Sequence, residues 1–215
     1  MRKAAFYGGW LIAALALISP LCPLSVSLFS ARVAQHMMLI LLAAPLVVAG
    51  RSASALAAAF GVAAPCARWT RATPLGAAVV FALLLWFWHA PAPYAMTFTS
   101  TFVYWSMHLS VFGAALCLWH GLLEGQGASV IAKLASGLLS SAQMGFLGAL
   151  ITLAPRAVYA PHALTTAAWG LTPLEDQQLG GILMWVPGCL VFLAFALLAL
   201  LPALSETETR AYRSV

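Results

Sequence analysis

Long, uninterrupted blocks of apolar residues are the strongest constraint on how this chain can fold. A block near 20 residues is the length of helix that crosses roughly 30 Å of hydrocarbon. Because 63% of the 215 residues are hydrophobic and only 7% are charged, with a mean hydropathy of +0.97, lipid is the expected solvent for these blocks. The sequence therefore predicts an all-α, polytopic helical membrane protein. Its six expected transmembrane helices lie at about 4–20, 31–50, 73–89, 102–123, 130–154 and 179–201.

Positive charges are unevenly distributed between the two predicted faces. With a cytoplasmic N-terminus, only Arg32 and Arg156 of the ten Lys and Arg residues fall outside. This is the bias of the positive-inside rule, and an even number of spans places both termini in the cytoplasm. The net charge of +5 then indicates topology and contact with anionic membrane lipid, with no nucleic acid as a partner. The inner residues are Arg2, Lys3, Arg51, Arg68, Arg71, Lys133, Arg210 and Arg213.

The residues that follow the first two apolar blocks indicate whether the first block is cleaved and where the chain leaves the membrane. The first block resembles a signal peptide but ends in the sequence PLCP without a small-x-small cleavage site, so we expect it to remain as a helix. The stretch 51–71 is rich in small residues and charged at its ends, which indicates a connector at the membrane surface. Residues 1–215 are expected to form a single transmembrane domain.

Three of the five histidines are predicted to share one leaflet. His36 and His108 each lie roughly 9 Å below the outer end of a span, at 1.5 Å per residue. His89 closes the third span in WFWHAPAPY, where aromatic residues mark the interface and a proline stops the helix. Ionisable groups inside a membrane are costly and usually functional, so these three are candidate metal ligands. His162 lies in the outer loop above them, whereas His120 falls at the opposite interface and is excluded.

Thioethers and one carboxylate accompany these histidines. Imidazole suits copper, zinc and iron, whereas thioether sulfur favours Cu(I), so a collection of both on the outer face points first to copper. Asp176 is the only aspartate in the chain and is a candidate to bind the metal or to orient a ligating imidazole. The candidate additional ligands or supporting groups are Met37, Met38, Met107, Asp176, Met184 and His162.

Two other residues near this face are chemically notable. Arg32 lies one turn before His36 on the same helix face, where it is an awkward neighbour for a cation and a suitable partner for Asp176 or Glu175. Cys22 is the one cysteine with a possible role as a redox-active or metal-binding thiol. The four cysteines form no CxxC pair, and small buried apolar residues are their simpler interpretation.

The histidines and methionines also have a purely structural interpretation. A lone polar residue in a span often only forms a hydrogen bond to a neighbouring helix, and a methionine in an apolar helix usually only packs. Three histidines at one depth favour a site. No phosphate-binding loop, HExxH or GxSxG motif occurs, so we expect no enzymatic turnover.

The ordered motifs of the chain resemble a known family. They run from SPLCPLSVSLFSARVAQHMM through WFWHAPAPY and YWSMHLS to LEDQQLGGILMWVPG, about residues 19–188. This set is similar to the multi-span CtaG family of cytochrome c oxidase assembly factors, in which His36, His89 and His108 fall on histidine positions and Asp176 on a DQ motif. The sequence departs from the family at Arg32, where many members have a further histidine, and it has six predicted spans where relatives can have seven.

The resemblance implies a function in the bacterial inner membrane. It implies an assembly factor that assists copper delivery or insertion into a haem-copper oxidase subunit, with a site facing the periplasm and a periplasmic copper chaperone as a candidate donor. Two alternatives stay open from the residues alone. His36 and His108 on facing helices are also suitable axial ligands of a b-type haem, and a ligand-free scaffold would need no metal at all.

Overall fold

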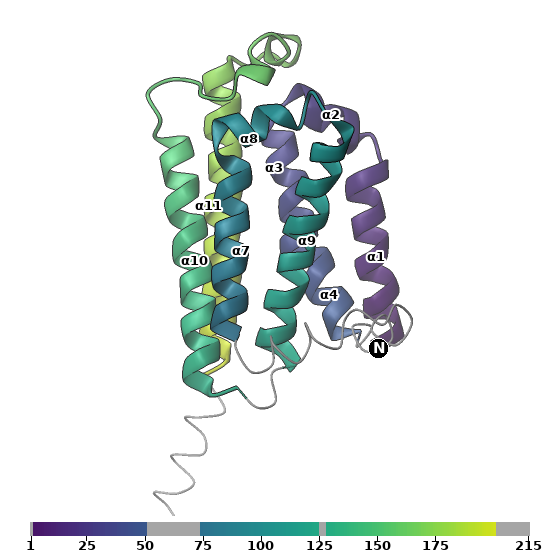
Figure 1. Cartoon of the computed structure of the whole chain (residues 1–215), viewed down its shortest axis with the longest axis vertical. Coiled ribbons are helices and arrows are strands. Elements are labelled where there is room, and N and C mark those ends of the chain that lie inside the picture. The colour runs from purple at the N-terminus through teal and green to yellow at the C-terminus, as the bar shows by residue number, and fades with distance from the viewer. Residues whose placement is uncertain (1, 51–73, 125–127, 201–215) are drawn as a thin grey trace, which may run out of the picture.

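The computed structural model describes residues 2–50, 74–124 and 128–200, and every regular element within them is a helix (Figure 1). The elements α2 and α8 lie together at one end of the bundle, and α1 and α10 lie at opposite edges (Figure 1). Long helices are α1 (Arg2–Ile18), α7 (Pro74–His89), α9 (Thr101–Glu124), α10 (Val130–Thr152) and α11 (Pro173–Leu198). Shorter elements are α2 (Leu21–Ser27), α3 (Phe29–Met37), η1 (Met38–Ala43), α4 (Ala44–Ala49), α8 (Pro91–Met96), η2 (Ala160–His162) and η3 (Thr166–Trp169).

The all-helical membrane architecture is confirmed, whereas the predicted number of six spans is not confirmed. Among the described residues, four stretches are long and apolar enough to cross a bilayer: Phe29–Ala49, Thr101–Leu123, Val130–Thr152 and Pro173–Leu198. The pair α1 and α2, bent by 47°, would be a fifth. Helix α7 has only 16 residues, about 24 Å at 1.5 Å per residue, although it packs in the bundle against α9 and α10. The topology of six spans with both termini inside stays a prediction, and the connector 51–71 lies outside the described residues.

The last helix begins six residues earlier than the apolar block at 179 suggested. Its N-cap is Thr172, whose side chain accepts a hydrogen bond from the backbone N–H of Glu175, while the Glu175 carboxylate accepts from the backbone N–H of Thr172. This reciprocal pair is a capping box, which satisfies N–H groups that the first turn of a helix leaves unpaired. Asp176 is consequently a helical residue, held in the first turn of α11.

Helices α10 and α11 pack closely because glycines face each other across their contact. A Cβ atom built on Gly148 would stand 2.9 Å from the carbonyl oxygen of Gly181, and one built on Gly181 would stand 2.8 Å from that of Gly148. Any side chain at either position would push the backbones apart. Small residues at such contacts allow dispersion contacts along the backbones, which replace the hydrophobic effect where lipid is the solvent.

The second span changes its helical pitch just after the candidate ligand His36. Residues 38–43 form a π-helix, in which the backbone N–H of Ala44 donates to the carbonyl of Leu39, five residues earlier. The next N–H in this register would donate to Ile40, but residue 45 is a proline and has none. The carbonyl of Ile40 therefore loses its backbone donor. π-Helical turns often occur where a sequence conflict or a function displaces the α-helical pattern.

A tryptophan from another helix supplies the missing hydrogen bond. The indole N–H of Trp119, on α9, donates to the carbonyl oxygen of Ile40 at 2.8 Å. Trp119 is 3% exposed, and its ring stacks on Phe192 of α11 with ring centres 5.2 Å apart. One buried side chain thus joins three helices and satisfies the carbonyl that Pro45 leaves without a donor.

We expect Trp119→Phe to destabilise the protein by about 1–3 kcal/mol, because a buried carbonyl oxygen then loses its donor. In a Pro45→Ala background, residue 45 regains an N–H that can donate to Ile40, and the same substitution should cost clearly less. Thermal unfolding of the four proteins in detergent measures this difference. Equal losses in both backgrounds would contradict the proposed compensation.

Candidate metal site

Three imidazoles from three helices meet near one end of the bundle. His36 lies on α3 and His108 on α9, each seven positions after the first residue of its helix, and His89 is the last residue of α7. The ring centres of His36 and His108 are 5.1 Å apart, and those of His36 and His89 are 6.3 Å apart. All three are buried, with 3%, 2% and 6% exposure for His36, His108 and His89. The clustering expected from their common depth is present.

Backbone carbonyls orient two of these rings. Nδ1 of His89 is 2.8 Å from the carbonyl oxygen of Leu85, and Nδ1 of His108 is 3.0 Å from that of Tyr104. A carbonyl oxygen only accepts, so each Nδ1 must carry the proton when the ring is neutral. Nε2 then bears the lone pair. A metal-binding histidine commonly has this second hydrogen bond, which holds the ring in place and selects the tautomer.

The inner nitrogens of the cluster lack suitable hydrogen-bond donors. Nε2 of His36 is buried and has no hydrogen-bond partner. Nε2 of His108 faces the side-chain oxygen of Gln35 at 3.4 Å, and the amide nitrogen of Gln35 donates instead to the carbonyl of Ala16 at 2.8 Å. Because His108 carries its proton on Nδ1, its Nε2 and the Gln35 oxygen are two acceptors that face each other, and the unpartnered Nε2 of His36 belongs to the neighbouring ring. A buried, unsatisfied acceptor is costly, and a cation placed among these atoms would remove that cost.

The spacing of the rings is close to what a shared ion requires. A metal about 2 Å from each Nε2 lies about 3.2 Å from each ring centre, so two ligands at trigonal or tetrahedral angles have centres roughly 5.2–5.5 Å apart. The His36–His108 separation is slightly shorter than this range, and the His36–His89 separation is slightly longer. Within residues 2–50, 74–124 and 128–200, no three His, Cys, Asp or Glu side chains already stand in metal-binding positions. Ligation by His36, His89 and His108, the histidine trio, therefore needs side-chain rotations.

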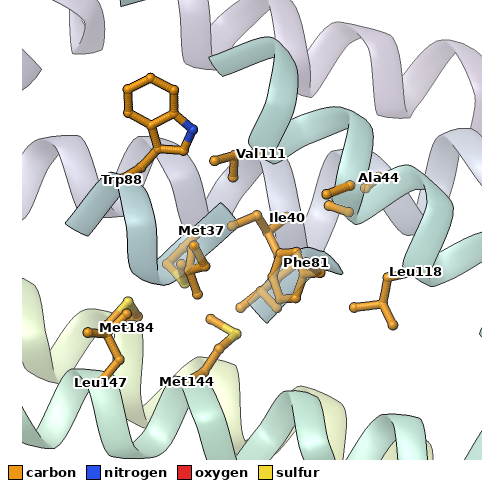
Figure 2. Close-up of a cluster of buried hydrophobic side chains, with 14 of the residues drawn as sticks. Met37, Ile40, Ala44, Phe81, Trp88, Val111, Leu118, Met144, Leu147 and Met184 are labelled. Atoms are coloured by element: carbon orange, nitrogen blue, oxygen red, sulfur yellow. The ribbon is translucent and has the colours of Figure 1, made fainter. Parts of the chain in front are cut away.

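The methionines of the sequence prediction divide between two apolar clusters. Met37, Met107 and Met184 are buried in the main cluster, together with Met144, which the sequence analysis did not single out. Figure 2 shows Met37, Met144 and Met184 among aliphatic and aromatic side chains. Met38 packs instead against the smaller cluster that α1 contributes to. Packing accounts for all of these positions, and a ligand role for Met37, Met38, Met107 or Met184 stays a prediction.

Asp176 caps a helix that is distant in sequence. Its carboxylate accepts hydrogen bonds from the backbone N–H of Phe29 at 2.7 Å, from that of Ser30 at 3.1 Å, and from the Ser30 hydroxyl at 2.5 Å. Phe29 is the first residue of α3, whose own N-cap, Leu28, offers no side-chain acceptor. These hydrogen bonds are charge-assisted, and the negative carboxylate also interacts favourably with the positive, N-terminal end of the α3 dipole. The structure thus gives Asp176 a part in placing α3, which carries His36.

The expected pairing of Arg32 with Asp176 or Glu175 is wrong. Arg32 is 1% exposed, and it donates from Nε to the carbonyl of Ser25 at 3.1 Å and from Nη1 to the hydroxyl of Thr97 at 2.7 Å. Its guanidinium carbon lies 4.1 Å from the centre of the Phe98 ring, a cation–π contact. Asp176 is engaged by the start of α3, so it is not the group that pairs with this charge.

His162 lies in the segment between α10 and α11, in an aromatic cluster separate from the three histidines. Burial raises the pKa of Tyr94 and lowers that of His162, so the Tyr94 hydroxyl donates to a neutral His162 ring at 2.7 Å. In the same loop, the Tyr159 hydroxyl donates to the carbonyl of His89 at 2.9 Å, and its ring stacks on Phe29 at 4.1 Å. The loop therefore covers the end of α7 and limits the access of water to the histidines. A direct ligand role for His162 stays a prediction.

Three further side chains lie near the trio. The sequence analysis did not predict Gln35 or Tyr104 as site residues, and it named Cys22 without a contacting residue. Gln35 faces His108, and the Tyr104 ring lies 4.3 Å from the His108 ring centre. The Cys22 sulfur is 3.6 Å from the Tyr104 hydroxyl, so this thiol lies at the edge of the same cluster, next to Tyr104. The sequence carried one signal for Gln35, since a second polar residue directly before His36 inside a span is unusual.

Comparison with known proteins gives a match to one family model, which covers all of the described residues. The model described as cytochrome c oxidase caa3 assembly factor matches residues 1–205. No curated protein and no solved structure matches the chain.

We expect Asp176→Ala and Asp176→Asn to lower the free energy of unfolding by about 2 kcal/mol or more, because buried N–H donors of α3 lose a charged acceptor. Glu175→Gln is the matched control: this neighbouring carboxylate is exposed and keeps an acceptor oxygen after substitution. Thermal unfolding in detergent measures all three. A loss for Asp176→Ala no larger than for Glu175→Gln would contradict the capping role.

Proposed function

Because the chain belongs to the family of cytochrome c oxidase caa3 assembly factors, we propose that it holds copper as cargo for the oxidase it helps to assemble. The His36, His89 and His108 imidazoles bind the ion, on the periplasmic side of the bacterial inner membrane. The observation that carries this proposal is the buried, unpartnered Nε2 of His36, with the His108 ring centre 5.1 Å from its own. Copper is bound and then released as cargo, so the protein does not need to catalyse a reaction.

The chemistry of the donors fits a soft or borderline ion. Nitrogen ligands from imidazole suit copper, and the Nδ1 hydrogen bonds of His89 and His108 leave Nε2 free to bind. Neutral imidazoles add no charge to the ion, which suits Cu(I) in a low-dielectric environment. Copper also explains a link to cytochrome c oxidase, because a haem-copper oxidase without its metal cannot bind and reduce oxygen.

The position of the trio suits transfer to a partner. His89 is the last residue of α7, α8 follows directly after it, and the Tyr159 hydroxyl donates to the His89 carbonyl. Helix α8 lies at one end of the bundle (Figure 1). Movement of α8 and of the segment that carries Tyr159 would open the site to a periplasmic copper chaperone or to the oxidase subunit that receives the metal. We propose these two as the donor and the acceptor.

A haem between histidines is the competing function. Axial imidazoles on opposite faces of a haem iron have ring centres about 6.4 Å apart, since each lies about 3.2 Å from the iron. His36 and His108 are closer than this, at 5.1 Å, whereas His36 and His89 stand at 6.3 Å. A pyridine haemochrome spectrum of the purified protein tests this form directly, and stoichiometric haem would overturn the copper proposal.

We expect His36→Ala, His89→Ala and His108→Ala each to weaken Cu(I) binding by more than about tenfold, because removing one ligand from a small set costs at least as much as removing a group that orients it. Competition with a chromogenic Cu(I) chelator measures the affinity of the detergent-purified protein. His120→Ala is the control on the same helix as His108, about 18 Å further along α9. Equal losses in all four variants would indicate destabilisation in place of ligation.

In cells, we expect deletion of the protein to lower the activity of a copper-containing terminal oxidase while its transcripts persist. Added copper should restore part of that activity, because a higher free concentration raises occupancy by mass action. His36→Ala, expressed at normal levels, should behave like the deletion. Full oxidase activity in that strain would contradict the copper proposal and favour a ligand-free scaffold.

A further inference from the structure

Within the described residues, a buried positive charge lies beside the histidine trio and has no carboxylate to neutralise it. The hydrogen bonds of Arg32 go to two neutral oxygens, on Ser25 and Thr97. Within the described ranges, the groups that act on its charge are Tyr94, Tyr104 and Cys22. None of the three is a carboxylate. The two phenols and the thiol are neutral when protonated, so they do not offset the positive charge of Arg32.

The distance between this charge and the trio is bounded by Tyr104. The Arg32 guanidinium carbon is 5.7 Å from the centre of the Tyr104 ring, and that centre is 4.3 Å from the centre of the His108 ring. The guanidinium carbon is therefore at most about 10 Å from the His108 ring centre. Arg32 also precedes His36 by one turn of α3, which places both on the same helix face. The two hydrogen bonds and the Phe98 ring prevent the side chain from turning away.

The buried carboxylate of Asp176 does not act on the histidine trio. Asp176 is held by the start of α3, and its charge acts on Tyr94 and His162, on which Arg32 acts as well. Of these two charges, only that of Arg32 also acts on His36 and His108. An ion bound by the trio would therefore experience Arg32 as its principal fixed charge.

We propose that Arg32 makes the histidine site selective for a singly charged ion, Cu(I), against divalent ions such as Zn(II) and Cu(II). This inference rests on the proposed copper function. Repulsion between two charges is proportional to their product, so a divalent ion is opposed twice as strongly as a monovalent one. At about 10 Å and an effective dielectric constant of about 20, each additional unit of charge on the ion lowers its affinity on the order of tenfold. Burial keeps this repulsion from being screened by salt.

Selectivity of this kind addresses a specific chemical difficulty. Three imidazoles by themselves are a good site for zinc as well as for copper, so ligand type does not separate the two ions. A fixed charge separates them by their own charge and needs no additional ligand. Arg32 thus acts as a positioning and specificity residue that does not touch the ion.

The test is the ratio of Cu(I) to Zn(II) affinities of the full-length, detergent-purified protein, with Arg32→Gln and Arg32→Met as neutral variants. Removal of the charge should strengthen Zn(II) binding about hundredfold and Cu(I) binding about tenfold, so that the ratio falls about tenfold. Arg32→Lys, which keeps the charge, should leave the ratio near that of the wild type. Arg156→Gln is the matched control, since Arg156 is exposed in the loop after α10.

A further variant tests the charge without removing the arginine. Thr97→Asp places a carboxylate where Nη1 of Arg32 already donates, and it should lower the ratio in the same direction even if both neutral Arg32 variants fail to fold. Equal gains for the two ions, or an unchanged ratio in the folded variants, would overturn the selectivity role while leaving the copper function intact. Wild-type protein that binds neither ion would overturn the proposed function, and the selectivity role with it.

Discussion

The carboxylate of Asp176 is the contact that the arrangement of the site depends on. It accepts three hydrogen bonds from Phe29 and Ser30 and so provides α3 with the N-terminal cap that Leu28 cannot supply. These N–H groups are buried, where leaving them without an acceptor would be costly. Because α11 holds Asp176 through its own capping box, one helix sets where the other begins. The depth of Arg32 and His36 follows from that start.

The same requirement for satisfied polar groups shapes the rest of the second span. Pro45 leaves the carbonyl of Ile40 without a backbone donor, and Trp119 supplies one from α9. Around the histidines, carbonyls take the Nδ1 protons of His89 and His108. Nε2 of His36 has no hydrogen-bond partner, a property it shares with buried atoms of Ser140, Gln143, Thr152 and His162. What distinguishes it is its position, because the His36 ring lies between those of His108 and His89. The copper proposal rests on this combination.

Much of this protein follows from its sequence because lipid imposes simple rules on a chain. Apolar blocks near the length of a bilayer predicted helices that the structure contains at Phe29–Ala49, Thr101–Glu124 and Val130–Thr152. Helical rise alone placed His36 and His108 at one depth, and their rings lie 5.1 Å apart. The ordered motifs indicated the family, which the match over residues 1–205 confirms. Hydropathy was less informative about ends: Thr172 and Glu175 start α11 before its apolar block begins.

Only the tertiary structure decided which polar groups meet. Charge alone suggested that Arg32 would pair with Asp176, yet Asp176 caps α3 while Arg32 lies against Phe98. The sequence determined the medium, the helices and the depth of each histidine, because these depend on composition and on a fixed rise per residue. The partners of Asp176, Arg32 and the Ile40 carbonyl depended on how helices distant in sequence rotate and pack, since a buried polar group takes whichever partner the packing brings within reach.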